Sequence, residues 1–258
     1  MTTPSVSCSK FTCLSPKMFV RHVLSLSEDI FQKLSEANAF ETFSNGRQGA
    51  IIADRTEDGW LPIVRSTSSY SRPSQDFAIV HLELAHKIKE AIGDETCFFN
   101  NAMVEIYQPS DRKMKYHSDL SLDLSCSSYI ALFSCYEKGT SASPRQLLIK
   151  SKATNLESKI DLEHNSVVVF SVATNGAYLH KIVGGNCSIE DGKWLGVTFR
   201  QSKTFIREQV GQQVFQTTGR TLRKAAEDEK LAFFKHKSKE NAEIGYIYPE
   251  IDYTLSEH

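Results

Sequence analysis

The sequence predicts a mainly β protein with flanking helices, folded as a β-sandwich or jelly roll. Between Cys97 and Gln201 the apolar residues form short β-like runs separated by Gly, Asn, Ser and Pro. Because these runs follow helices instead of alternating with them, they favour antiparallel sheets packed face to face. Val167–Phe170 is apolar on both faces, which predicts a strand inside a sheet. The six runs are 97–107, 129–136, 146–150, 166–172, 178–183 and 195–201.

Length and composition fit one domain. The 258 residues are 40% hydrophobic and 24% charged, so the chain can bury a sizeable core. We expect a loosely held arm, rich in Ser and Thr, at 1–17 and a single domain at 18–258. Its core should span about 97–203, with a C-terminal helix and tail at 204–258. The net charge of -1 excludes a strongly basic nucleic-acid coat, although a local basic patch could still follow phosphates.

Two helices are predicted ahead of the β-rich part. The first, at 27–40, begins with a serine that can act as its N-cap and has two acids in its first turn. The second has apolar residues at helical spacing over 77–92 and is closed by Gly93. His81 and His86 lie on this helix five residues apart, which is a poor spacing for one metal ion. We therefore expect both to be surface or packing residues.

The region between these helices should contain a hairpin and a loop. The apolar runs 49–53 and 60–64 flank a turn-like Asp-Gly pair, which predicts a β-hairpin. The polar and aromatic segment 65–73 follows. It is either a solvated loop or a loop that faces a substrate, in which case Tyr70 and Arg72 are the candidate substrate-binding residues.

After the last β-like run, a charged helix is predicted from Arg220 to about His236, followed by a tail with three tyrosines. Lysines on and beyond this helix could contact phosphates. Interspersed acids make a solvated helix face the simpler interpretation. These lysines are Lys230, Lys235, Lys237 and Lys239.

The cysteine pattern indicates a reducing compartment. Six cysteines are scattered without a C-x-x-C pair, in a chain too long to need a disulfide framework. We expect free thiols, no disulfides and an intracellular location, cytoplasmic or nuclear. No apolar run approaches the length of a membrane span, so no membrane contact is expected.

The sequence motif best suited to binding a metal ion is His117-Ser118-Asp119. On an extended segment successive side chains alternate, so His117 and Asp119 point the same way and could bind one ion. His180 lies three predicted strands later, and a jelly roll can bring it to the pair. Two histidines and one carboxylate on one face suit a non-haem Fe(II) oxygenase. Taken singly, the pair could be a polar turn and His180 a structural histidine. The order of His-x-Asp followed by a histidine on a later strand is more specific for a metal site than either part alone.

Two more residues extend this hypothesis. Arg200 lies on the run after His180, where its planar guanidinium could hold the carboxylate of an acidic cosubstrate. Its simpler interpretation is a surface charge at a strand end. Asp123 falls on the same alternation as the metal-binding pair and could hydrogen-bond a substrate. An exposed strand acid is equally compatible with its position.

Several of these segments resemble the AlkB-type Fe(II)/2-oxoglutarate-dependent dioxygenases, over about residues 98–203. The segments that carry the resemblance are Phe98–Tyr107, His117–Asp119, Leu162–Phe170 ahead of His180, and Thr198–Gln201. The resemblance implies a double-stranded β-helix core of the jelly-roll or cupin-like kind. It also implies that His117, Asp119 and His180 are the iron ligands and the catalytic centre, with Tyr107 and Arg200 contacting the cosubstrate. Fe(II), 2-oxoglutarate and dioxygen are then the expected partners.

The chain departs from the family pattern at two positions. Glu105 stands where the family commonly has an asparagine, and Trp194 stands where it has an arginine that grips the distal carboxylate of 2-oxoglutarate. Either Lys193 or Arg200 takes over this task, or the cosubstrate differs. Parts of the sequence also look like a TET-related algal branch that modifies 5-methylcytosine with ascorbate.

The AlkB resemblance implies a methylated or alkylated nucleobase of DNA or RNA as the substrate. Such a base would be flipped from a duplex or offered single-stranded. Two alternatives remain at this level: an oxygenase acting on a small metabolite or a protein side chain, and a non-catalytic cupin-like binding module. The complete set of metal ligands argues against the binding module.

Overall fold

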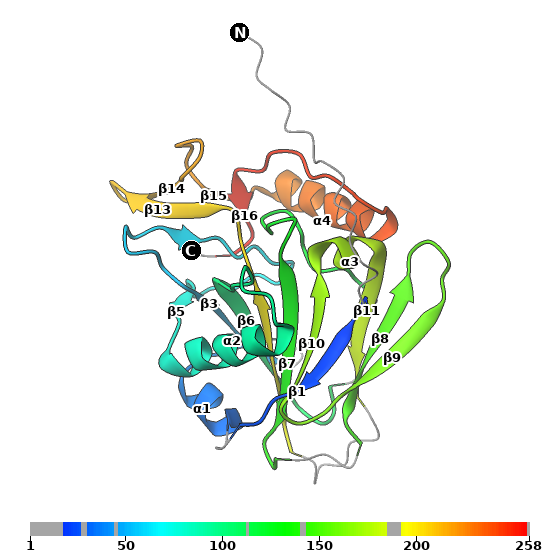
Figure 1. Cartoon of the computed structure of the whole chain (residues 1–258). Coiled ribbons are helices and arrows are strands. Elements are labelled where there is room, and N and C mark those ends of the chain that lie inside the picture. Colours follow the sequence, from blue (N-terminus) through cyan, green and yellow to red (C-terminus); the bar gives the residue numbers. More distant parts are fainter. Residues whose placement is uncertain are drawn as a thin grey trace.

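The computed structural model describes residues 18–26, 30–43, 46–111, 114–139, 143–184 and 192–256. Two mainly antiparallel sheets form its centre, with helices on the outside (Figure 1). This arrangement confirms the predicted jelly roll. The N-terminal arm expected at 1–17 lies outside the described residues.

The larger sheet has the strand order β1-β10-β7-β12-β6-β3-β2, and β5 pairs with β3. The predicted interior position of Val167–Phe170 is confirmed, since β10 lies between β1 and β7. The strands of this sheet are β1 (Val20–Val23), β2 (Glu41–Thr42), β3 (Gln48–Ala53), β5 (Gln75–Asp76), β6 (Asn101–Tyr107), β7 (Tyr129–Tyr136), β10 (Ser166–Ser171) and β12 (Trp194–Arg200).

The smaller sheet has the order β11-β8-β9, with β8 at Arg145–Ser151, β9 at Glu157–Leu162 and β11 at Tyr178–Val183. The strand β9 was not predicted, because its sequence is mostly polar and most of its residues are exposed. The bounds predicted for β7 and β11 agree with the structure.

Strand alternation separates two cores. Side chains on one face of the larger sheet pack against α1 (Ile30–Glu36) and α2 (Ile79–Ile92). The other face meets the smaller sheet and carries Trp194, Gly196, Thr198 and Arg200 of β12. The inner face of this one strand is therefore apolar at its beginning and charged at its end.

The predicted end of the second helix is confirmed, whereas the first helix is shorter than predicted. Gly93 adopts the left-handed conformation, with φ 70°, and its N–H bonds to Lys89 O at 3.0 Å. The described part of the first helix is α1, and the residues predicted to begin it, 27–29, lie outside the described ones. A further helix, α3 (Val172–Ala177), connects β10 to β11.

The predicted hairpin over 49–53 and 60–64 is wrong. A turn does form, because Gly59 has φ 80° and its N–H bonds to Thr56 O. The strand before the turn, β3, is buried between β2 and β6, so neither of its edges is open to its neighbour in sequence. β4 (Leu61–Pro62) pairs instead with β13 (Phe205–Gln209).

The C-terminal region also differs from its prediction. The helix is α4 (Glu227–Ala242), not 220–236, because β15 (Arg223–Lys224) pairs with β16 (Tyr253–Thr254) just before it. A hairpin of β13 and β14 (Gln212–Phe215) was missed. Its turn places a valine at positive φ, Val210, which a β-branched residue rarely adopts.

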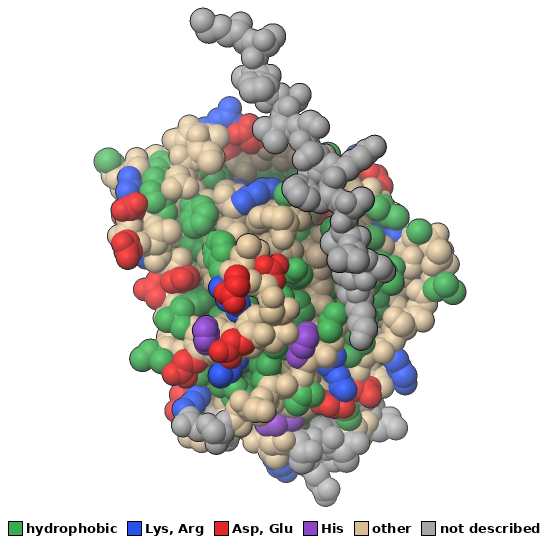
Figure 2. Space-filling model, viewed as in Figure 1, with side chains coloured by type: hydrophobic (Ala, Val, Ile, Leu, Met, Phe, Trp, Pro, Cys, Tyr) green, Lys and Arg blue, Asp and Glu red, His purple; other side chains and the backbone are tan. Residues whose placement is uncertain are grey.

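The outer surface carries no strong charge bias on the face shown in Figure 2, where acidic and basic side chains are intermixed. Among the described residues, no helix combines the length and apolarity needed to cross a membrane. Cys97, Cys126 and Cys135 are free thiols, and the other three cysteines lie outside the described residues.

His81 is a packing residue, as its poor spacing from His86 suggested. It is fully buried, its Nδ1 accepts the N–H of Ala78 at 2.9 Å, and its Nε2 lies 3.0 Å from the side-chain amide of Asn38. Burial lowers the pKa of His81 to about 4. The folded protein thus holds a neutral imidazole that the unfolded chain, with a pKa near 6.5, protonates more readily.

His81 should therefore make the protein less stable as the pH falls from 6.5 toward 4. Between about pH 7.5 and about pH 5 this single group should remove about 2 kcal/mol of unfolding free energy. In His81→Gln the loss over this interval should be smaller by that amount, as measured by urea denaturation at the two pH values. His86→Gln, on the exposed side of the same helix, should show the unchanged loss. Equal pH dependence in the wild type and His81→Gln would contradict the prediction.

Candidate active site

A cavity of about 340 Å³ opens between the two sheets, at the end of β12 where Arg200 lies. Its wall combines apolar side chains with charged ones of both signs. The apolar ones include Met103, Met114, Leu124, Leu132, Phe170 and Ile182. The charged ones are Arg47, Arg65, Lys115, Arg200 and Lys237, together with Glu105, Asp119 and Asp123.

His117, Asp119 and His180 come together on the cavity wall. One ligand atom from each lies within 4.8 Å of the others, as a shared metal ion requires. Asp119 Oδ1 is 3.3 Å from His180 Nε2 and 3.9 Å from His117 Nε2. The strand expected around His117 is reduced to a single bridge with His180 on β11. This bridge still places both imidazoles on the same side.

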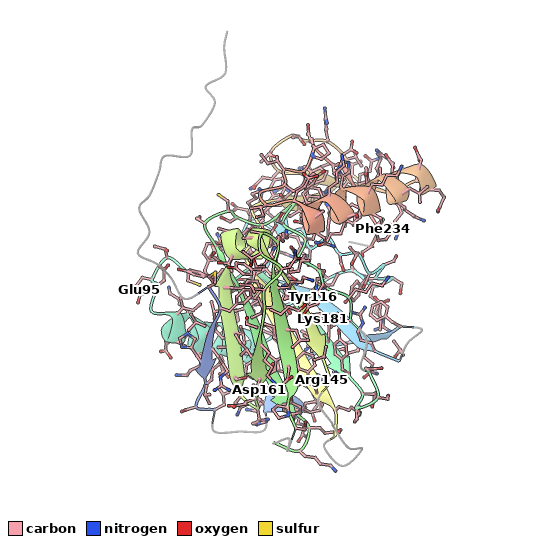
Figure 3. The ribbon with its side chains drawn as sticks, turned by 90° about the vertical axis from the view of Figure 1, so that its right-hand side faces the viewer. Glu95, Tyr116, Arg145, Asp161, Lys181 and Phe234 are labelled. Atoms are coloured by element: carbon pink, nitrogen blue, oxygen red, sulfur yellow. The ribbon has the colours of Figure 1, made fainter. Side chains whose placement is uncertain are left out.

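Residues next to the two histidines confirm the alternation. Tyr116 and Lys181 point to the opposite side, where the lysine Nζ lies 4.2 Å from the centroid of the tyrosine ring. Figure 3 shows these two side chains close together on the outside of the smaller sheet. Inward and outward side chains thus alternate in both segments that carry a histidine.

The orientation of the acidic ligand is fixed by Arg200. Arg200 donates from Nε and Nη2 to the same oxygen, Asp119 Oδ2, at 2.8 and 2.7 Å. This leaves Oδ1 facing the two histidines. The Nδ1 of His117 lies 3.0 Å from Lys115 O, which leaves its Nε2 for the metal. Ligand atoms oriented in this way fit an Fe(II) site with three protein ligands.

The backbone around Asp119 is held by side chains from two helices. Asn175 of α3 is fully buried and bonds the N–H and the C=O of Asp119, at 2.7 and 2.9 Å. On α4, Asn241 accepts the N–H of Ser118 at 3.0 Å and Lys237 donates to the C=O of Ser118. The segment without a regular strand therefore still has its backbone groups satisfied.

Lys237 also forms a buried ion pair with Glu240, which in turn accepts from the N–H and hydroxyl of Ser121 and from Tyr248. Lys237 is 8% exposed, so it is neither a solvated lysine nor a phosphate contact. Lys235 and Lys239 are exposed. The network on α4 was missed because a lysine and a glutamate occupy the buried face of a helix that otherwise reads as polar.

Electrostatics at the site favour the protonation states that bind metal. Burial by itself would raise the pKa of Asp119, but Arg200 and the two histidines together hold it well below its ordinary value. Burial, together with the neighbouring His180, lowers the pKa of His117 to about 4. The carboxylate and neutral imidazole are the forms that ligate a divalent ion.

The far end of the space between the sheets is filled by aromatic side chains. Trp194 packs against Tyr107, with ring centroids 5.3 Å apart, and both are buried. A Cβ at Gly196 would lie 2.2 Å from the Trp194 ring, so the ring lies flat against the strand at this glycine. Arg145 covers both rings at 5.3 and 5.7 Å. The position expected to hold an arginine thus belongs to an aromatic plug.

The candidate cosubstrate residues take different places relative to this plug. Arg200 lines the cavity. Tyr107 lies in the plug, and its hydroxyl reaches the cavity-lining Glu105 at 3.2 Å. Lys193 pairs with Glu137 at 3.5 Å, about 20 Å along β12 from Arg200.

The candidate substrate residues are also separated. Asp123 is buried and lines the cavity, and burial raises the pKa of its carboxyl group. Tyr70 is buried against Phe43, and Arg72 is exposed with its backbone bonded to Glu41. Neither Tyr70 nor Arg72 lines the cavity, because only the first part of the segment 65–73 faces it.

Sequence reasoning missed two cavity-lining arginines. Arg47 donates to Glu105 Oε1 at 2.6 Å and to Ser68 Oγ at 2.9 Å, and nothing in its sequence context marked it. Arg65 is 7% exposed and lies beside Asp123. It belongs to the polar segment 65–73 that the sequence marks as a possible substrate-facing loop, although the candidates predicted from that segment are Tyr70 and Arg72.

The jelly roll and its cluster of two histidines and one aspartate define the class of non-haem Fe(II) oxygenases. A model of the 2OG-Fe(II) oxygenase superfamily matches residues 27–200. This covers well over half of the chain, so the protein belongs to the 2OG-Fe(II) oxygenase superfamily. It is an Fe(II)- and 2-oxoglutarate-dependent dioxygenase.

A comparison with solved structures supports this fold. OsALKBH1 superposes with a TM-score of 0.50 at 15% sequence identity, over 73% of this chain and 100% of that one. A Pseudomonas putida prolyl-4-hydroxylase (P4H) gives a TM-score of 0.43 at 15% identity, over 71% and 92%. No curated protein matches the chain by sequence. The likeness to OsALKBH1 agrees with the AlkB-type fold expected from the sequence.

Removing the acidic ligand should abolish tight metal binding. We expect Asp119→Ala to lower Fe(II) or Mn(II) affinity by about 100-fold or more, because one of three protein ligands is lost. Anaerobic metal titration would measure it. Asp123→Asn is the matched control, since it changes another buried acid of the same cavity, and its metal affinity should stay within about threefold of the wild type. Unchanged affinity in Asp119→Ala would contradict the ligand assignment.

Proposed function

We propose that this dioxygenase oxidises a methyl or alkyl group on a nucleobase of DNA or RNA. The observation that carries the proposal is a cavity of about 340 Å³ that combines an apolar lining with paired donors and acceptors beside the metal ligands. A flipped-out base is a flat group with apolar faces and a hydrogen-bonding edge, and it needs a pocket of this kind. The AlkB-type sequence segments support the same substrate class.

Different residues of the cavity would have different roles in this reaction. His117, Asp119 and His180 would hold Fe(II), and Arg200 would keep Asp119 turned toward it. Bound Fe(II) and 2-oxoglutarate would supply the oxidising chemistry, as cofactors generally do. The apolar wall, with Met103, Leu132 and Phe170, would limit the access of water and place the alkyl group near the metal.

Arg200 remains our proposed anchor for the cosubstrate, with Arg47 as a second cation on the same wall. The guanidinium of Arg200 uses Nε and Nη2 on Asp119, and its Nη1 is left to meet an oxoacid carboxylate. In the family, an arginine at the position of Trp194 binds the distal carboxylate of 2-oxoglutarate. Here arginines at the open end of the cavity would bind it instead. Tyr107 would contribute through Glu105, and the position of Lys193 does not favour a role for it.

A second candidate keeps the same metal site but changes the cosubstrate to ascorbate. Two observations favour it: Glu105 places a carboxylate on the cavity wall, and Trp194 fills the place of an arginine. A dicarboxylate meets repulsion there unless cations outweigh it, whereas a neutral or singly charged ligand meets less. A small metabolite or a protein side chain remains the alternative to a nucleobase substrate.

The substrate proposal predicts a chemical change in nucleic acid. Methylated DNA and RNA incubated with the protein, Fe(II) and 2-oxoglutarate should yield nucleosides with a lost or hydroxylated methyl group, as detected by mass spectrometry. Succinate should appear in step with the product. Turnover with ascorbate and without succinate would favour the second candidate. No change in either polymer, alongside oxidation of a small metabolite, would overturn the nucleobase proposal.

The anchor proposal predicts two losses from one substitution. Arg200→Ala should weaken 2-oxoglutarate binding by about 3 kcal/mol or more, because a buried carboxylate loses its cation. It should also weaken metal binding by about 10- to 100-fold, since Asp119 loses the group that orients it. Arg200→Lys should restore only part of both, because lysine lacks the planar pair of donors. Calorimetric titration with Mn(II) and then with 2-oxoglutarate would separate the two effects.

Lys193→Ala tests the alternative anchor in the same titrations. Its 2-oxoglutarate affinity should equal that of the wild type, because Lys193 lies beyond the aromatic plug. A loss in Lys193→Ala with none in Arg200→Ala would assign the anchor to Lys193.

A further inference from the structure

Three arginine–carboxylate pairs line the cavity, and one of them differs from the others. Arg200 with Asp119 and Arg47 with Glu105 are closed by hydrogen bonds of 2.6 to 2.8 Å. In the third pair, Arg65 Nε lies 3.5 Å from Asp123 Oδ2. That separation exceeds the 2.7–2.9 Å typical of a charge-assisted hydrogen bond, so the third pair is open.

The open pair leaves polar atoms without hydrogen bonds inside the protein. Nε and Nη1 of Arg65 and Oδ2 of Asp123 are buried and make no hydrogen bond to a described residue. The two side chains are only 2% and 8% exposed. Buried polar groups are nearly always bonded, and those that are not call for a specific explanation. A ligand that enters the cavity would supply the missing partners.

Contacts on the side away from the cavity hold Arg65 and Asp123 in place, with the gap between Arg65 Nε and Asp123 Oδ2 left open. The carbonyl of Asp123 accepts from Lys203 N at 2.8 Å and from Ser202 Oγ at 3.1 Å. The guanidinium of Arg65 lies over the ring of Phe215, 5.5 Å from its centroid. The backbone of Asp123 and the guanidinium of Arg65 are thus held by separate contacts.

The loop that carries Arg65 is fixed at both ends. Before it, Ile63 N bonds to Thr204 O at 3.0 Å. After it, the side chain of Ser256 accepts the N–H of Tyr70 and donates to Ser68 O. The backbone of the loop that carries Arg65 is therefore held at both ends.

From this geometry we infer that Arg65 and Asp123 together bind the hydrogen-bonding edge of a neutral, planar ligand that carries an acceptor next to a donor. This inference rests on the proposed function and deepens it: the ligand edge is the Watson–Crick edge of the flipped base. Arg65 donates to the acceptor of that edge, and Asp123 accepts from its neighbouring N–H.

The pair also excludes other ligands. A carboxylate would meet Arg65 favourably but would be repelled by Asp123 at the same place. A base alkylated on its edge nitrogen offers no acceptor to Arg65. The site therefore favours bases whose alkyl group lies away from the hydrogen-bonding edge, which leaves that group free to face the metal ligands on the same wall.

The test uses the full chain loaded with 2-oxoglutarate and Zn(II), a diamagnetic ion that leaves the resonances of cavity residues observable. The probes are 1-methylcytosine, which has the acceptor and the donor side by side, and 4-amino-1-methyl-2-pyridone, its neutral 3-deaza analogue, in which a C–H replaces the N3 acceptor. A third probe, 2-pyrrolidinone, carries the same edge without a nucleobase. Binding is followed by the side-chain Nε–H resonances of arginine, with that of Arg65 assigned from its loss in Arg65→Lys.

We expect 1-methylcytosine to shift the Arg65 resonance and the 3-deaza analogue to bind at least about tenfold more weakly. Arg65→Met and Asp123→Asn should each weaken 1-methylcytosine binding by about tenfold or more. Arg55→Met, which removes an exposed arginine outside the cavity, should bind like the wild type. The measurement on the wild-type protein stands even if Arg65→Met does not fold.

The outcomes test the role of the Arg65–Asp123 pair separately from the proposed nucleobase substrate. Binding of 1-methylcytosine with the Arg65 resonance unmoved and unchanged affinity in the variants would overturn the role of the pair and leave the proposed function standing. Binding of 2-pyrrolidinone through Arg65, with no base bound, would uphold the pair and overturn the nucleobase proposal. If no probe binds, the inference is wrong, and nucleoside mass spectrometry decides the proposed function separately.

Discussion

The metal site depends on the different partners of the two carboxylate oxygens of Asp119. One oxygen takes both hydrogen bonds from Arg200, and the other faces His117 and His180. A carboxylate that rotated freely would offer neither oxygen to a metal reliably. Because Arg200 comes from β12 and His180 from β11, this one interaction ties both sheets to the segment that carries the ligands. The rest of the site is arranged around it.

The C-terminal helix acts as part of the active-site scaffold. The ligand segment has only a single strand-like bridge, so its backbone groups need other partners. Asn241 and Lys237 of α4 supply them, and Glu240 extends the support to Ser121. A buried lysine and glutamate are costly unless each is paired. Here their pairing also orders the residues that hold the metal ligands.

The space between the sheets has two different ends. Trp194, Tyr107 and Arg145 close one end with stacked rings and a cation, while the other end remains open beside the metal ligands. In this protein the charges that could meet a cosubstrate or substrate are gathered at the open end. Of its three arginine–carboxylate pairs, two are closed by direct hydrogen bonds and the third, Arg65 with Asp123, is open.

The sequence by itself determined the jelly-roll class, the bounds of strands such as β7 and β11, and the three residues that the structure brings together as candidate metal ligands. These features depend on the alternation of apolar and polar residues within short segments and on the order of a few residue types along the chain. Both can be read directly from the sequence. Only the tertiary structure decided that β3 pairs with β6 instead of its neighbour, that Lys237 is buried under the ligand segment, and that Arg65 faces Asp123. These pairings join residues far apart in the chain, and whether a charged side chain is buried or solvated depends on what packs against it.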